Sequence, residues 1–138
     1  MNVEMLDHLN MTVRSVDEST NWYRRVFGFE SVEEGSDGGR PWRILKSGEA
    51  LLCIYEMPQR NHPSIDVHEH HAIKHFAFRI KDRGLWERTV EKEGLRLYYG
   101  GAIDYPHSQS WYVHDPNGYE IEVAAWDEGR ARFDSPGA

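Results

Sequence analysis

Residues 114–123 read His-Asp-Pro-Asn-Gly-Tyr-Glu-Ile-Glu-Val, and this stretch decides the fold. Its Asp-Pro-Asn-Gly segment predicts a tight turn, because proline presets φ, asparagine tolerates the left-handed region and glycine supplies a positive φ. The aromatic and β-branched residues 110–113 and the alternating residues 119–123 predict the two strands of a β-hairpin. In the second strand, Glu120 and Glu122 share one face, opposite the apolar face. A carboxylate inside a strand needs a partner, so the fold must supply one for Glu122.

The first part of the chain predicts a strand, a helix and three further strands within residues 3–56. Residues 5–13 alternate between an apolar face and a polar face, and the polar face carries His8. Residues 18–27 place apolar side chains at helical spacing, and Gly28 is in the usual position to end that helix. The three strands that follow are expected at 29–34, 42–46 and 50–56.

The same order returns within residues 72–126, after an irregular linker at 57–71. Residues 73–80 alternate as the opening strand does, and His75 has the place that His8 has in the first part. A helix is expected at 84–93, and further strands at 95–99, 110–114 and 119–125. A polar tail, 127–138, completes the chain, which is predicted to be a single domain over 1–138.

The repeat predicts an α+β fold of two tandem β-α-β-β-β modules that form a cupped mixed β-sheet around a metal-binding cavity. In each module the apolar strand face must cover the helix, which leaves His8, His75 and Glu122 on the face toward the cavity. Two imidazoles and one carboxylate are a ligand set for a mononuclear divalent metal ion with open coordination positions. Each histidine alone is more often a structural residue than a ligand, so the hypothesis depends on the three together.

Composition excludes several classes of protein. The net charge of −7 argues against nucleic-acid binding, which needs a basic face. The single cysteine, Cys53, can form neither an intramolecular disulfide nor a cysteine zinc cluster. No apolar run has the length of a membrane span, and the first residues do not have the pattern of a signal peptide. A cytoplasmic protein is therefore expected, and nucleic acid and membrane are not expected as partners.

These motifs resemble the vicinal oxygen chelate superfamily over about residues 3–126. The superfamily includes glyoxalase I, extradiol dioxygenases, methylmalonyl-CoA epimerase, fosfomycin-resistance thiol transferases and bleomycin-resistance proteins. The matching segments are Leu6-Asp7-His8-Leu9, the Trp-Tyr-Arg-Arg-Val-Phe-Gly-Phe run of residues 22–29, Lys74-His75-Phe76-Ala77-Phe78, and Asp115-Pro116-Asn117-Gly118 followed by Ile121-Glu122-Val123. The resemblance implies that His8, His75 and Glu122 hold the metal. It also implies a homodimer, often with each metal site built from both chains, and leaves open whether the modules are swapped.

The reaction is harder to assign than the fold. The segment from Tyr112 to Glu122 resembles the end of the extradiol dioxygenase signature, which implies that Tyr112 is an acid or hydrogen-bond donor near the metal. The alternative is an aromatic residue of the cavity wall. We expect an extradiol-dioxygenase-like enzyme with Fe(II), although Mn(II), Ni(II), Co(II) and Zn(II) also suit these ligands.

Three alternatives stay open. A glyoxalase-like lyase or isomerase would need a fourth ligand on the strand at 50–56, where Glu56 has the wrong parity to face the cavity unless a bulge turns it. A fosfomycin-type thiol transferase and a non-catalytic, drug-sequestering protein like the bleomycin-resistance proteins are the others.

Overall fold

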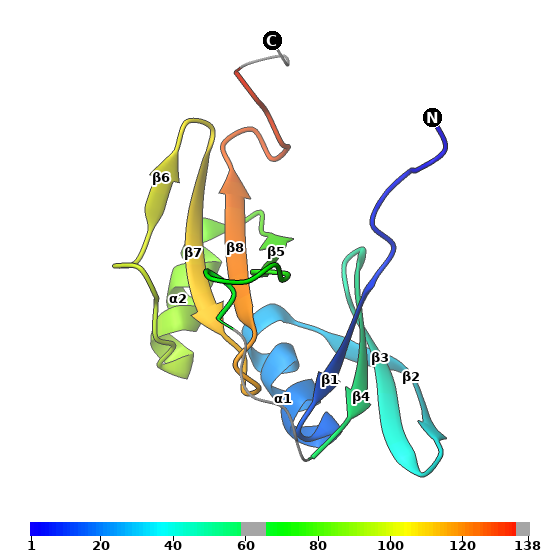
Figure 1. Ribbon diagram of the computed structural model, residues 1–138. Coiled ribbons are helices and arrows are strands. Elements are labelled where there is room, and N and C mark those ends of the chain that lie inside the picture. The colour runs from blue at the N-terminus through cyan, green and yellow to red at the C-terminus, as the bar shows by residue number, and fades with distance from the viewer. Residues whose placement is uncertain (59–65, 135–138) are drawn as a thin grey trace. The chain divides into compact units, whose positions relative to one another are not determined.

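The computed structural model describes residues 1–58 and 66–134. The chain divides into two compact units, Met1–Ser64 and Ile65–Ala138. Each unit has a strand, a helix and three more strands, as the repeat predicts (Figure 1). The predicted α+β class and the two β-α-β-β-β modules are confirmed. Residues 59–65 of the expected linker and 135–138 of the expected tail lie outside the described residues.

The first unit has one helix and a four-stranded mixed sheet. Its elements are β1 (Leu9–Val13), α1 (Val16–Phe27), β2 (Glu30–Asp37), β3 (Arg40–Ser47) and β4 (Ala50–Glu56). The strand order is β1-β4-β3-β2, with β1 parallel to β4 and the other pairs antiparallel. The helix between β1 and β2 lets the chain return so that the parallel pair can form.

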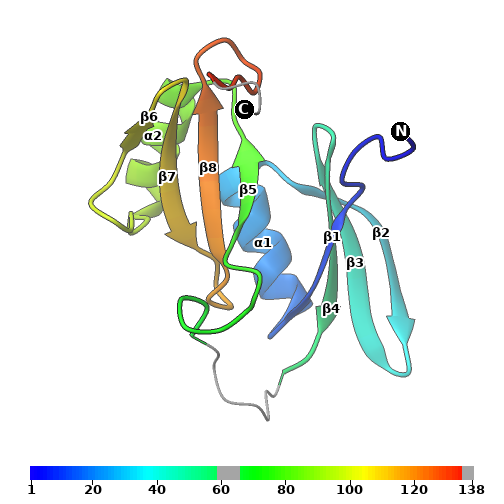
Figure 2. The same cartoon turned by 45° about the horizontal axis from the view of Figure 1, so that its top comes forward.

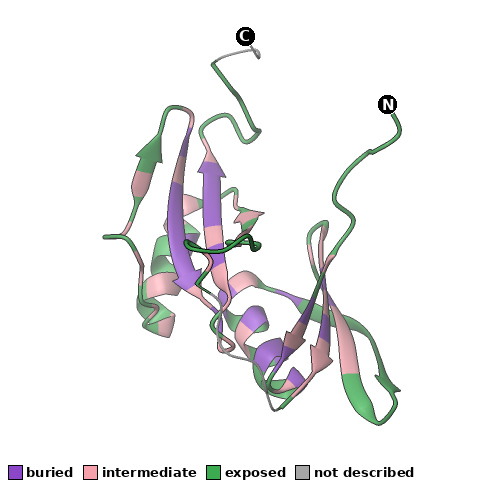
Figure 3. Cartoon of the chain, in the orientation of Figure 1, coloured by how far each residue is buried: buried purple, intermediate pink, exposed green. Residues whose placement is uncertain are grey.

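Local sequence determines where α1 begins and ends. The Ser15 side chain accepts a hydrogen bond from the backbone amide of Glu18 at 3.1 Å, which caps the first turn. Gly28 ends the helix with φ at 70°, a conformation that other residues adopt only at a cost. The buried side of α1 includes Tyr23 and Val26, and Figure 3 shows the alternation of buried and exposed residues along it.

The second unit repeats this plan, and all its elements except the last strand are shorter than their counterparts. Its elements are β5 (Phe76–Arg79), α2 (Arg83–Glu93), β6 (Ile103–Tyr105), β7 (Ser108–His114) and β8 (Glu120–Trp126). The order is β5-β8-β7-β6, with β5 parallel to β8 and the other pairs antiparallel. Most of the buried residues of this unit lie on its two central strands, β7 and β8 (Figure 3).

The helix α2 covers one face of the second sheet and lies behind β7 in Figure 2. Asp82 caps its N-terminus by accepting a hydrogen bond from the amide of Leu85 at 2.9 Å. The buried Trp86 meets Trp111 of β7 edge to face, with ring centroids 6.5 Å apart. Neither α1 nor α2, the helices of the described part of the chain, is long and apolar enough to cross a membrane.

The strand predicted at 95–99 is wrong, and β6 forms later in the chain. Tyr99 has φ at 58°, followed by Gly100 and Gly101 at 86° and 101°, so the backbone turns here and cannot continue as a strand. The amide of Tyr98 still donates to the carbonyl of Tyr112 at 2.9 Å. This segment therefore lies against β7 as a turn.

Candidate metal centre

The turn between β7 and β8 has the hairpin form that its sequence predicts. Asp115 is buried, and its Oδ1 accepts hydrogen bonds from the amides of Asn117 and Tyr119 at 2.8 and 2.9 Å. An aspartate that bonds its own following backbone in this way closes the turn. The register then makes Tyr112 the direct Cα partner of Glu122. The hairpin thereby presents a tyrosine and a carboxylate on the same face of the sheet.

His75, immediately before β5, contacts Glu122. Its Nε2 lies 3.0 Å from Oε1 of Glu122, and the other oxygen, Oε2, accepts a hydrogen bond from the hydroxyl of Ser110 at 2.9 Å. The side chains of His75 and Glu122 are 30% and 20% exposed, so a small ligand can reach the pair. The second unit thus brings together two of the three predicted metal ligands, although the coordination itself stays a prediction.

Tyr112 lies beside this pair. It is 8% exposed, and its ring meets the His75 ring edge to face, with centroids 5.7 Å apart. Its hydroxyl is 3.0 Å from the hydroxyl of Tyr105. Burial first, then the bond to Tyr105 and the charge of Glu122, raise the pKa of Tyr112 far above its ordinary range. Tyr112 therefore stays protonated near neutral pH and can donate a hydrogen bond.

The third predicted ligand, His8, belongs to the first unit and lies immediately before β1. Its Nδ1 is 2.8 Å from Oδ2 of Asp7, and its side chain is 44% exposed. Because β1 is parallel to β4 as β5 is to β8, His8 and His75 occupy equivalent places in the two units. The symmetric placement expected from the sequence is present in the topology. That His8 is a ligand stays a prediction.

The two units differ at the positions equivalent to Glu122 and Tyr112. The strand registers put Cys53 of β4 in the place of Glu122, and Ile44 of β3 in the place of Tyr112. Burial, followed by nearby carboxylates, raises the pKa of the Cys53 thiol. A protonated thiol is a poor nucleophile and a poor metal ligand. Only the second unit therefore carries the carboxylate and the tyrosine.

Glu56, considered above as a fourth ligand, has a structural partner. Its Oε1 accepts a hydrogen bond from the backbone amide of Val16 at 3.0 Å, at the first residue of α1. A carboxylate at this end of a helix also complements the helix dipole. Glu56 follows Cys53 by three residues, so strand alternation puts its side chain on the helix side of the sheet. This position fits a helix cap.

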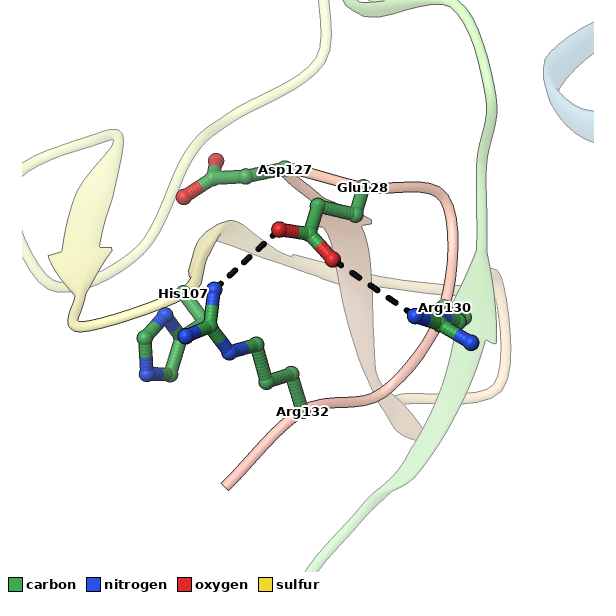
Figure 4. Close-up of a pocket in the computed structure, with 5 residues that line it drawn as sticks. All are labelled: His107, Asp127, Glu128, Arg130 and Arg132. Atoms are coloured by element: carbon green, nitrogen blue, oxygen red, sulfur yellow. Dashed lines mark hydrogen bonds and ion pairs between the residues drawn. The ribbon is translucent and has the colours of Figure 1, made fainter. Parts of the chain in front are cut away.

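A small pocket of about 170 Å³ lies elsewhere in the second unit, at the β6–β7 turn and the segment after β8 (Figure 4). Glu128 pairs with Arg132 at 3.1 Å and with Arg130 at 3.9 Å, as the dashed lines show. His107 and Asp127 complete the lining and pair with Asp134 and Arg83. Because each of these side chains already has an ion-pair partner, inside the pocket or beside it, we assign the pocket no function.

The model of the Glyoxalase/Bleomycin resistance protein/Dioxygenase superfamily matches residues 5–123. The chain belongs to this superfamily. The resemblance to the vicinal oxygen chelate superfamily that the motifs indicate is therefore confirmed.

Two relatives are similar to this chain in sequence, and one solved structure is similar to it in fold. Glyoxylase I 4 from Arabidopsis thaliana is 28% identical over 134 residues, which cover 92% of this chain and 74% of that protein. Catechol-2,3-dioxygenase from Bacillus subtilis (strain 168) is 26% identical over 126 residues, 87% of this chain but only 41% of that protein. The fosfomycin resistance protein FosX from Listeria monocytogenes, in its crystal structure with Mn(II) and sulfate, has a TM-score of 0.64 and 16% identity, covering 89% and 93% of the two chains.

The His75 nitrogen and the Glu122 oxygen are donor atoms of the kind that bind divalent metal ions. Members of the superfamily bind divalent metals, and imidazole nitrogen with carboxylate oxygen is a set that Fe(II), Mn(II) and Zn(II) accept. His75 and Glu122 bring one such atom each to within 3.0 Å of the other, so a single ion could contact both. Within residues 1–58 and 66–134, no three His, Cys, Asp or Glu side chains form a complete metal-binding group. The pair fits a metal site that needs at least one further ligand.

Sequence reasoning missed Ser110, which contacts this pair, and Tyr99, which contacts the neighbouring Glu120. Ser110 bonds Glu122, and strand alternation could have revealed it, because Ser110 shares a face with Tyr112. Tyr99, which bonds Glu120, had no such signal, because its segment was predicted to be a strand. These contacts decide how rigidly Glu122 and its neighbours are held.

Proposed function

We propose that the chain is a metal-dependent, extradiol-dioxygenase-like enzyme that acts on a small molecule chelating the metal through oxygen atoms. His8, His75 and Glu122 hold the metal, with Fe(II) the first candidate. The observation that carries this proposal is the contact of His75 with Glu122 beside a protonated Tyr112. The proposal includes a homodimer, which the resemblance implies, and a location in the cytoplasm, which is the expectation from the sequence.

Each residue has a defined task in this proposal. A divalent metal ion, when bound, supplies Lewis acidity toward the oxygen atoms of the substrate. The hydroxyl of Tyr112 donates a hydrogen bond to a substrate oxygen or gives it a proton. The raised pKa favours the hydrogen bond, because it makes this hydroxyl a weaker acid. Ser110 holds the second oxygen of Glu122, so that the first oxygen is directed at His75. His75 and Glu122 are then fixed in the orientation that metal binding needs.

A glyoxalase-like lyase is the second candidate. The observation in its favour is the Arabidopsis relative named Glyoxylase I 4, which this chain matches over 74% of that protein's length. The bond between Glu56 and the start of α1 weighs against it, because that bond occupies the carboxylate expected to serve as a fourth ligand. Dioxygenase chemistry needs no fourth protein ligand, so it ranks first.

Oxygen-dependent turnover tests the ranking. The full chain, expressed without a histidine tag and loaded with Fe(II) under anaerobic conditions, should consume a catechol only when oxygen is admitted. His75→Ala should lose both metal uptake and turnover while keeping its circular dichroism spectrum. His107→Ala is the matched control, since His107 pairs with Asp134 away from the proposed ligands, and it should keep both.

Other outcomes point to the other functions. Turnover of a hemithioacetal with Ni(II) or Zn(II), and no demand for oxygen, would favour the lyase. Full metal occupancy in His75→Ala would refute the ligand assignment. A metal-free protein that binds a drug-like ligand tightly without turnover would indicate a sequestering role.

A further inference from the structure

Glu120 contacts three side chains from separate segments of the second unit. It begins β8 two residues before Glu122, so the two carboxylates share one face of the sheet. Its side chain is 14% exposed. Nδ1 of His75 lies 3.5 Å from one of its oxygens, and Nε2 of His114 lies 3.6 Å from the other. The hydroxyl of Tyr99 donates a hydrogen bond to it.

The His75 ring lies between two carboxylates. Nε2 is 3.0 Å from Glu122, and Nδ1, on the other side of the ring, is 3.5 Å from Glu120. When one imidazole nitrogen binds a metal, a carboxylate near the other nitrogen fixes the proton there and sets the plane of the ring. Glu120 has the position that this role requires.

We propose that Glu120 is a positioning residue: it holds the proton of His75 on Nδ1 and turns Nε2 toward the metal position beside Glu122. This inference rests on the proposed function, since it assigns Nε2 of His75 to the metal. It adds a residue that does not itself bind the metal or the substrate.

The turn at residues 98–101 supports Glu120 from the other side. Tyr99 is the residue other than glycine that has a positive φ among those described, at 58°, a conformation that costs free energy unless the surroundings hold it. Its ring also meets Tyr112 edge to face at 5.2 Å. The neighbouring Tyr98 stacks on His114 at 3.8 Å. The alternative is that Glu120 only tethers this turn, and the experiment must separate the two roles.

Zn(II) affinity, measured by calorimetric titration of the full chain with Zn(II) alone, separates them. Glu120→Ala should weaken binding by about 10–100-fold, the usual effect of removing a carboxylate that orients a metal-binding histidine. Glu120→Gln should stay closer to the wild type, because its amide oxygen still accepts from Nδ1–H. Tyr99→Phe breaks the bond to the turn but leaves Glu120 beside His75, so it should bind Zn(II) nearly as the wild type does.

Two results would overturn the positioning role. One is Glu120→Ala binding Zn(II) as tightly as the wild type. The other is Tyr99→Phe losing as much affinity as Glu120→Ala, which would show that the carboxylate acts through the turn. Circular dichroism on each variant checks that the fold is kept.

A second measurement needs no metal. In metal-free Glu122→Ala the rival carboxylate at Nε2 is gone, so nitrogen-15 NMR at a pH where His75 is neutral should find its proton on Nδ1. Adding Glu120→Ala should move that proton toward Nε2. Equal tautomer populations in the two proteins would refute the inference. If the wild-type chain takes up no Zn(II), the proposed function fails, while this measurement still decides the role of Glu120.

Discussion

Glu122 is held at both of its oxygens, by His75 on one side and by Ser110 on the other. A carboxylate at 20% exposure without partners would lose solvation and gain nothing in return. The contacts at 3.0 and 2.9 Å give each oxygen of Glu122 a partner. At the scale of single residues, the second unit therefore holds the carboxylate of Glu122 beside the imidazole of His75.

The prediction for a single residue concerns the hydroxyl of Tyr112. Tyr112→Phe removes the hydroxyl and keeps the buried ring, so metal uptake should be retained while turnover falls by about 10²–10⁴-fold, the usual contribution of general acid catalysis. The pKa of Tyr112 is raised, so in the wild type the donor should survive as pH rises past the ordinary tyrosine value. The measurement is a steady-state rate against pH with metal content determined in parallel. If Tyr112→Phe kept full activity, Tyr112 would be only an aromatic residue of the cavity wall.

The elements show where sequence patterns suffice and where they fail. The Asp115 turn and the Gly28 helix end are determined by local sequence, and each appears where the sequence predicts it. The strand expected at 95–99 is wrong, because Tyr99 takes a positive φ that its own side chain disfavours and that contacts with Glu120 and Tyr112 compensate. Compensation by residues distant in sequence cannot be read from a local pattern.

The same limit applies to the candidate site. Alternation alone puts Glu122 and Tyr112 on one face, and the repeat alone makes His8 equivalent to His75. Alternation also predicts that Glu56 points away from the face that carries Glu122 in the other unit. The structure adds that Glu56 accepts a hydrogen bond from the first residue of α1. Alternation also puts Ser110 on this face, but it does not predict which carboxylate oxygen Ser110 bonds. The contact of Glu120 with His75 joins segments far apart in the sequence, so spacing along the chain does not predict it.

The β2–β3 hairpin gives the prediction at the scale of elements. Gly35 is the Cα partner of Trp42, and a methyl group on Gly35 would lie 2.5 Å from the Trp42 ring. The Trp42 ring packs at a tilt against Tyr55, with centroids 6.3 Å apart, so Tyr55 hinders its movement away from the new methyl group on that side. Gly35→Ala should lower the free energy of unfolding by about 1–3 kcal/mol through overpacking. Denaturant unfolding measures it.

The exposed neighbour Ser36 supplies the control for this change. Ser36→Ala should stay within about 0.5 kcal/mol of the wild type. If Gly35→Ala were as stable as that control, the contact between Gly35 and Trp42 would not constrain the hairpin.

At the scale of the whole molecule, the repeat is symmetric in topology and asymmetric in chemistry. Both units place a histidine before the strand that pairs in parallel with the last strand of the unit. Only the second unit has a carboxylate and a tyrosine on the neighbouring strands, as Glu122 and Tyr112. In the first unit, Cys53 and Ile44 occupy the equivalent positions. Our proposal therefore has one metal site for each pair of units, with His75 and Glu122 from the second unit and His8 from a first unit.

A mixed dimer tests whether that contribution comes from the same chain or from its partner. His8→Ala and His75→Ala chains, carrying different affinity tags, are co-expressed and the doubly tagged protein is isolated. If each site takes His8 from one chain and His75 with Glu122 from the other, one of the two sites keeps all its ligands, while the second loses both histidines. We expect this arrangement, because the family resemblance implies sites built from both chains, so the mixed dimer should hold about half the wild-type metal content. If every site lies within a single chain, each site has lost one histidine and the mixed dimer should hold no more metal than either variant alone.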